Sequence, residues 1–176
     1  MTTDFDAIYD DYRMLHDAIR ELPDRYFVAL LSSEVRERRQ VLRDTIALDA
    51  SFKLLSRLEA ALKDKALRAT RRPGRRKGDA ISHELEQLVR RLAKRQRCSP
   101  RVAARDLPIE HVLILLRDHF RTRGESLHRT LSLAKAYFKS FRNWYAHGRI
   151  GEPTPKPPDV EEVMSIVLDI SGAIAI

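Results

Sequence analysis

The chain has 176 residues, 43% of them hydrophobic, and a formal net charge of +8. This length supports one ordinary hydrophobic core, so we expect a single domain spanning residues 1–176. With only six glycines, many helix-favouring residues and no stretch of strand-like alternation, the sequence excludes a sheet protein and predicts an all-α, antiparallel bundle of four to six helices.

The composition also restricts the compartment and the chemistry. No apolar run is long enough to cross a bilayer, and the acidic N-terminal stretch MTTDFDAIYDD is unlike a secretory signal. We therefore expect a cytoplasmic protein that does not enter a membrane. Cys98 is the only cysteine and the six histidines lack metal-binding spacing, so we expect no metal and no other cofactor. The basic charge favours a polyanionic partner.

The first part of the chain predicts two amphipathic helices. One runs from Phe5 to about Leu22, and its acidic first turns suit a helix N-terminus. The next begins at Ser32 or Ser33, because a serine hydroxyl can cap a helix, and continues to about Arg68. Its wide apolar stripe consists of Val41, Leu42, Ile46, Leu48, Phe52, Leu55, Leu58 and Leu62.

Asp49 interrupts this apolar stripe. A carboxylate is costly to bury among apolar side chains unless it is paired, so we expect Asp49 to have a cationic partner. If that partner is Arg142 or His147, Asp49 would support a functional site at the end of a later helix. The alternatives are an ion pair with some other arginine, or a position at the edge of the stripe that faces water.

A basic stretch, RATRRPGRRKG, spans residues 68–78, and its proline and glycine predict a loop. Its charge density suits contacts with phosphates without base specificity. The predicted RNA-binding residues are Arg71, Arg72, Arg75, Arg76 and Lys77. The following helix, residues 79–97, ends in further cations, and these extend the basic strip together with Arg101 and Arg105. The alternatives are a solvated charge run in the loop and simple complementarity to the helix dipole in the helix.

The next helix is predicted to begin at Pro108, a residue that suits a first helical position, and to end near Arg123. His111, His119 and His128 are expected to be surface or packing residues. Ser126 can cap the helix that follows.

A proline-rich stretch, GEPTPKPP at residues 151–158, predicts an extended loop. Asp159 and Glu162 after it resemble a capping box, in which two side chains satisfy each other's backbone N–H groups. They predict a final helix over residues 160–173, whose apolar residues would pack back onto the bundle.

The helix after Ser126 ends in a polar cluster formed by Arg142, Asn143 and His147, with Gly148 suited to stop the helix. Asn143 and His147 are four residues apart on one side of a helix, so the amide can orient the imidazole. Arg142 lies about 140° around the axis from His147, and the two converge through the long arginine side chain, a frayed last turn or a second copy of the chain. The apolar face that precedes the cluster consists of Leu131, Ala134, Phe138, Phe141 and Tyr145.

The sequence RNWYAH, from Arg142 to His147, resembles the motif of the HEPN superfamily, in which an arginine and a polar residue precede a histidine at the end of a bundle helix. The resemblance implies a HEPN-like helical bundle and a metal-independent endoribonuclease that acts as a toxin, a stress effector or an anti-phage effector. It also implies RNA as substrate, a homodimer with a composite active site and a cognate antitoxin protein as a further partner.

In such an enzyme the ribose 2′-hydroxyl attacks the adjacent phosphorus and leaves a 2′,3′-cyclic phosphate. The resemblance assigns proton transfer to His147, since an imidazole titrates near neutral pH. Arg142 would hold the phosphate, Asn143 would orient His147 or the phosphate, and Tyr145 would support the site. Three alternatives stay open: His147 as a cation that only complements the helix dipole, a non-catalytic basic helical protein that binds nucleic acid, and a helical module that binds a protein partner.

Overall fold

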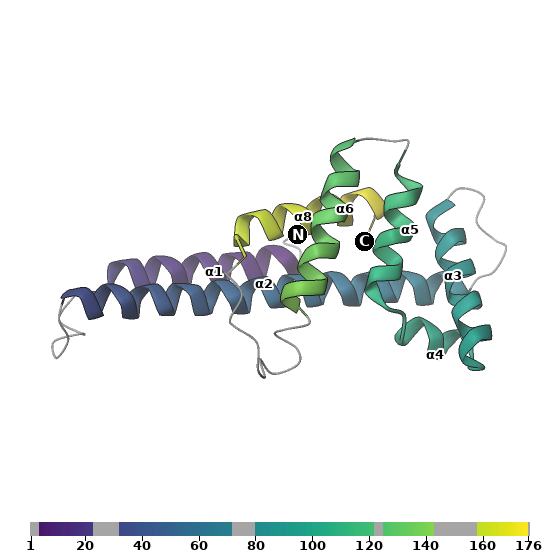
Figure 1. Ribbon diagram of the computed structural model, residues 1–176, viewed down its shortest axis with the longest axis horizontal. Coiled ribbons are helices and arrows are strands. Elements are labelled where there is room, and N and C mark those ends of the chain that lie inside the picture. Colours follow the sequence, from purple (N-terminus) through teal and green to yellow (C-terminus); the bar gives the residue numbers. More distant parts are fainter. Residues whose placement is uncertain (1–3, 23–31, 72–79, 122–124, 143–157, 176) are drawn as a thin grey trace.

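The computed structural model describes residues 4–22, 32–71, 80–121, 125–142 and 158–175, and every regular element in these ranges is a helix. The predicted all-α class is therefore confirmed. Among the helices described, none is long and apolar enough to cross a bilayer. Figure 1 shows one long helix, α2, running through the molecule with the other helices packed along it.

The N-terminal part of the structure is an antiparallel hairpin of α1 (Asp4–Glu21) and α2 (Ser32–Arg71). Arg57 pairs with Asp4 near one end of α1, and Arg39 donates a hydrogen bond to the carbonyl of Leu22 at the other. α2 has 40 residues, which corresponds to about 60 Å at 1.5 Å per residue. Both predicted helices are confirmed.

The apolar stripe predicted for α2 is buried from Leu48 onward more completely than before it. Leu55, Leu58 and Leu62 are fully buried, whereas Val41 and Leu42 are 55% and 41% exposed. Figure 1 shows the reason: the first turns of α2 project past the rest of the bundle and have α1 beside them. Amphipathic spacing placed Val41 and Leu42 on the stripe, but such spacing does not show which turns have neighbours.

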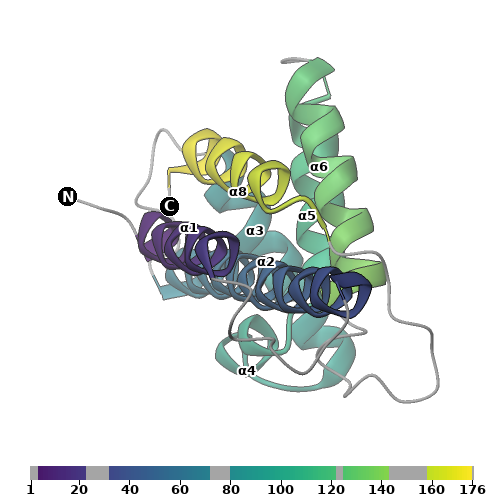
Figure 2. The same ribbon diagram turned by 90° about the vertical axis from the view of Figure 1, so that its left-hand side faces the viewer.

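The other helices pack on the second half of α2. They are α3 (Ala80–Gln96), α4 (Pro100–Arg105), α5 (Ile109–His119), α6 (Glu125–Tyr137), the π-helical turn η2 (Phe138–Arg142) and α8 (Val160–Ile174). Figures 1 and 2 show α8 on one side of α2 and α4 on the opposite side, while α5 and α6 cross α2 beside each other.

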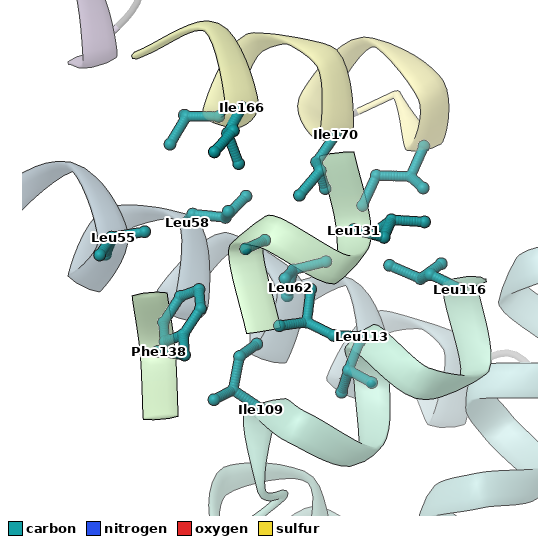
Figure 3. Packing of buried hydrophobic residues seen from close by; sticks show 14 of the residues in the cluster. Leu55, Leu58, Leu62, Ile109, Leu113, Leu116, Leu131, Phe138, Ile166 and Ile170 are labelled. Carbon is teal, nitrogen blue, oxygen red and sulfur yellow. The ribbon is translucent and has the colours of Figure 1, made fainter. Parts of the chain in front are cut away.

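The core lies where these helices meet α2. Figure 3 shows Phe138 from η2 beside Leu55 of α2, with Ile109 of α5 close to it. Leu131 of α6 and Ile170 of α8 pack on the other side of the same hydrophobic cluster. The predicted apolar face of the motif-bearing helix is confirmed over its described part, since the side chains of Leu131, Ala134, Phe138 and Phe141 are all buried.

Three predicted boundaries are wrong. α2 continues through Arg71 into the predicted loop, because Pro73 restricts only the residue before it, and Arg68 is stabilised within the helix by an ion pair to Asp64 at 2.8 Å. α5 ends at His119 and not near Arg123, where the N–H of buried Phe120 bonds to the carbonyl of Leu116. Ser126 does not cap α6, because α6 already includes Glu125.

The final helix is confirmed, but its predicted capping box is not. The Asp159 side chain accepts a hydrogen bond from the N–H of Glu161 at 3.0 Å and so caps α8. Glu162 accepts a hydrogen bond from the hydroxyl of Tyr137, because α6 passes close to the first turn of α8. Pro158 is buried, and the preceding part of the predicted proline-rich loop lies outside the described residues.

Candidate functional site

Most of the predicted catalytic cluster lies outside the described residues. Asn143, Tyr145 and His147 belong to the undescribed segment 143–157, and Arg142 is the last residue of η2. In the predicted RNA-binding loop, Arg72, Arg75, Arg76 and Lys77 are also outside the described residues, while Arg71 ends α2.

The backbone that leads into the motif is a π-helical turn and not the predicted α-helix. A π-helix has one extra residue per hydrogen-bonded turn, and such turns often mark functional sites. Phe138 and Phe141 are both buried in the core, and the Ser140 hydroxyl donates to the carbonyl of Ala136 at 2.7 Å. The wider turn lets both phenylalanines face the core.

Tyr137 ties the end of α6 to α8 directly before this turn. Its hydroxyl donates a hydrogen bond to Glu162. Burial, followed by this hydrogen bond and the charges of Glu162 and Asp159, raises the pKa of the Tyr137 phenol. The neutral phenol is thus the favoured form, and it can act as a donor throughout the physiological pH range.

A cluster of cations occupies the C-terminal end of α3 and the adjoining α4. We call this the α3–α4 basic cluster; its members are Arg91, Lys94, Arg95, Arg97, Arg101 and Arg105, all exposed. Within the described part of the chain none of the six forms an ion pair with a carboxylate, whereas neighbouring Arg90 pairs with Glu86 at 2.8 Å. Unpaired exposed cations are available to phosphates, so this surface suits a polyanion.

The local backbone concentrates these charges. Arg97 has a φ of 52°, a left-handed conformation that ends α3 and turns the chain sharply. The N–H of Cys98 bonds to the carbonyl of Ala93 at 3.0 Å, and the Ser99 hydroxyl accepts from the N–H of Val102 to start α4. As a result, the last turn of α3 and the whole of α4 present their cations close together.

The α3–α4 basic cluster and η2 are both positioned by α2, since α4 and η2 each pack against that helix. In Figure 1 the lower end of the green helix, where η2 ends, overlaps α2, while α4 lies below α2 and closer to α3. The N-terminus of α5 connects the two regions, since Ile109 packs near Phe138.

A groove between α3 and α5 was not anticipated from the sequence. It has a volume of about 550 Å³, and α3 contributes Glu84, Leu88 and Arg91 to its walls. α5 contributes His111, Ile114, Leu115, Asp118 and His119. We call this the α3–α5 groove. Its volume falls within the range of ordinary ligand sites, which is about 300–1,000 Å³.

One end of the α3–α5 groove holds an imidazole–carboxylate pair. His119 Nδ1 lies 3.0 Å from Glu84 Oε1, and the His119 side chain is only 9% exposed. Because an ionised carboxylate only accepts hydrogen bonds, Nδ1 carries the proton and donates. His119 Nε2 is buried without a partner in the described structure, and the ring packs edge-on against Phe120 with centroids 4.9 Å apart. The pair fixes the position of the Glu84 carboxylate.

The expectation that His111 and His119 are surface or packing residues is consistent with their positions, since His111 is exposed and His119 is packed. The sequence did not predict that His111 and His119 line the same groove. The spacing carried a signal: Glu84, Leu88 and Arg91 are separated by four and three residues, and so lie on one face of α3. The spacing does not show that α5 packs against this face of α3.

Asp49 has its predicted cationic partner, and the partner is Lys53, one helical turn away at 2.7 Å. The Asp49 side chain is 45% exposed and lies beside Ile8 and Tyr12 of α1. The partner is thus a lysine and not one of the arginines considered as alternatives, while the half-exposed position agrees with the alternative of an edge position facing water. A supporting role for Asp49 at the motif stays a prediction.

Comparison of the chain with protein-family models, with curated proteins and with solved structures found no match. Within the described ranges, no three His, Cys, Asp or Glu side chains gather as a metal site requires.

Proposed function

We propose that this protein is a metal-independent endoribonuclease whose catalytic residues are Arg142, Asn143 and His147. The observation that carries the proposal is the α3–α4 basic cluster, whose six cations form no ion pair with a carboxylate of the described residues, on a bundle in which α4 and η2 both pack against α2. An electropositive surface beside the motif would hold the phosphate backbone of RNA next to residues suited to cleave it. The basic residues from Arg71 to Lys77 would add further phosphate contacts.

The reaction is a transesterification within the substrate. The ribose 2′-oxygen bonds to the adjacent phosphorus, the bond from phosphorus to the 5′-oxygen breaks, and the products carry a 2′,3′-cyclic phosphate and a 5′-hydroxyl. His147 removes the 2′-hydroxyl proton or protonates the leaving 5′-oxygen. In a homodimer the second copy of His147 would perform the other transfer, so the site would be composite.

The remaining residues act through charge and orientation. Arg142 stabilises the negative charge that grows on the phosphate oxygens, a role that a planar guanidinium fills well. Asn143 orients His147 or the phosphate, and Tyr145 supports the site. The buried Phe138 and Phe141 support this role by giving Arg142 a firm attachment, because catalytic groups need a rigid scaffold. A cellular role as a toxin or defence effector, restrained by an antitoxin protein, would follow from such an activity.

The test is incubation of the purified protein with end-labelled RNA in the presence of a chelator. Wild-type protein should cleave the RNA and leave a cyclic phosphate, and expression should arrest growth. His147→Ala and Arg142→Ala should each reduce cleavage by about 10²–10⁴-fold without changing the thermal unfolding midpoint. His83→Ala is the matched control, since His83 is an exposed histidine of α3 bonded to Gln87. Cleavage that survives both motif substitutions rules out this active site.

The second candidate function is non-catalytic binding of nucleic acid, and the same unpaired cluster favours it. It predicts salt-dependent binding, which is lost when the cations of the α3–α4 basic cluster are removed. It differs from the nuclease in one observable: RNA incubated with wild-type protein stays intact and no cyclic phosphate forms.

A further inference from the structure

We propose that the α3–α5 groove holds one unstacked base of the bound RNA strand and selects a base that carries an exocyclic amino group. The inference rests on the RNA binding of the proposed function and adds to it a site of base recognition. It does not depend on whether the RNA is then cleaved.

The groove has two chemically different ends. α3 and α5 run in opposite directions (Figure 1), and the contact between Glu84 and His119 fixes their register at one end. Arg91 is seven residues beyond Glu84 on α3, about 10 Å along the helix axis. His111, eight residues before His119 on α5, lies near Arg91 at the other end of the groove.

Between the two ends the groove is apolar. Leu88, Ile114 and Leu115 line it and are each partly exposed. A nucleobase is flat, and its faces are apolar enough to lie against such side chains or to stack on an imidazole such as that of His111. The distance of about 10 Å between the ends matches a nucleotide placed with its phosphate at Arg91 and its base edge at Glu84.

The cationic end is available to a phosphate. The Arg91 Nε atom donates to the carbonyl of Gln87 at 3.4 Å, and no carboxylate in the described structure pairs with the guanidinium. Asp118, the second acid of the groove, is bonded to Arg117 at 3.2 Å. Arg91 thus keeps its charge for a ligand, and a guanidinium fork is well suited to phosphate oxygens.

The acidic end provides the selection. Glu84 uses Oε1 to accept from His119, and its other oxygen, Oε2, has no partner in the described structure. An ionised carboxylate can only accept hydrogen bonds, so it favours the amino groups of adenine, cytosine or guanine. Uracil has carbonyl oxygens where adenine and cytosine have amino groups, and it is disfavoured. His119 acts as a positioning residue, because its Nδ1–H holds the carboxylate in place.

The groove is continuous with the surface that would hold the strand. Arg91 belongs to both the α3–α5 groove and the α3–α4 basic cluster, and Lys94 and Arg95 follow it on α3. The phosphates beside the bound nucleotide would contact these residues. The strand would then continue over the cations of α4.

The test measures binding of fluorescent 2′-O-methyl oligonucleotides, which lack the 2′-hydroxyl nucleophile and stay intact. Oligo(A) and oligo(C) should bind wild-type protein about tenfold more tightly than oligo(U), the scale of one base-edge contact. Glu84→Gln should bring the ratio near one, because the amide can also donate a hydrogen bond to a uracil carbonyl. Glu86→Gln is the matched control, because Glu86 is on the same helix outside the groove and pairs with Arg90.

A second pair of variants tests the positioning role of His119. His119→Phe fills the buried space without a donor and should reduce the preference about as much as Glu84→Gln. His119→Asn places an amide N–H near the position of Nδ1 and should restore part of the preference. If the ring of His119 had only a structural role, Asn would not restore the base preference better than Phe does.

The outcomes separate this inference from the proposed function. Equal binding of all three oligonucleotides by wild-type protein, or a preference that survives Glu84→Gln, overturns the base-reading groove and leaves RNA binding in place. Failure to bind any of them overturns both. Free AMP that binds as tightly as oligo(A) would assign the groove to a mononucleotide and would overturn its assignment to an RNA strand.

Discussion

Tyr137 donates a hydrogen bond to Glu162, 25 residues further along the chain, and so joins the last turn of α6 to the first turn of α8. The segment between these two residues contains the whole Arg142–His147 motif. The bond therefore ties together the two ends of the segment that carries the proposed active site.

Replacing Tyr137 with Phe should destabilise the fold by roughly 1 kcal/mol, the usual contribution of one hydrogen bond. Chemical denaturation of the two proteins measures the difference. Tyr9→Phe serves as control, because the described contact of Tyr9 is its ring packing against Tyr12, and it should change the unfolding free energy by a few tenths of a kcal/mol at most. Equal effects of the two substitutions would contradict a specific role of the Tyr137 hydroxyl.

The same pair of proteins should differ in alkaline solution. Burial and Glu162 raise the pKa of Tyr137 in the folded state above the ordinary value of 10.0. A group with a raised folded pKa contributes stability that is fully present below its unfolded pKa and is lost as the pH rises through the folded pKa. The stability advantage of wild type over Tyr137→Phe should therefore shrink above about pH 10. A constant advantage at high pH would exclude this linkage.

Phe138→Ala should be among the most damaging single substitutions in the chain. Phe138 is fully buried between α2, α5 and α6, and truncating a buried Phe costs about 3–5 kcal/mol, a large part of the roughly 5–15 kcal/mol that stabilises a domain. Leu168→Ala is the control, since Leu168 is 44% exposed and should cost less than about 1 kcal/mol. A thermal unfolding midpoint that is unchanged in Phe138→Ala would mean that η2 is not anchored as described.

The cations of the α3–α4 basic cluster should set the salt dependence of RNA binding. Each phosphate contact adds roughly 0.7 to the slope of log affinity against log salt concentration for a single strand. Arg95→Ala and Arg101→Ala should each reduce the slope by about that amount and should do so for every RNA sequence. Arg90→Ala should leave the slope nearly unchanged, because Arg90 pairs with Glu86. Equal reductions in all three variants would argue for a diffuse effect of net charge.

Asp49→Asn should change little. Its partner Lys53 lies one turn away on the same exposed surface, and such pairs contribute about 0.3–0.5 kcal/mol. We expect the unfolding free energy to change by no more than this, and RNA cleavage to stay within about twofold of wild type. A tenfold loss of cleavage with unchanged stability would instead establish Asp49 as a supporting residue of the active site.

The sequence by itself determined the helices and most of their faces. The spacing of Leu131, Ala134, Phe138 and Phe141 predicted the side that is buried, and the ends of α3 and α8 were predicted within one or two residues. This succeeds because helical periodicity and capping are local: they depend on residues three or four apart and need no knowledge of the rest of the fold.

Only the tertiary structure decided which faces have partners. Val41 and Leu42 continue the apolar stripe of α2, yet they are exposed because the bundle does not reach them. Glu84 and His119 are 35 residues apart in the chain and meet only because α3 and α5 pack against each other. The π-helical turn likewise forms where Phe138 and Phe141 must both reach one core. Long-range packing places these groups, and its energy depends on contacts that no short stretch of sequence contains.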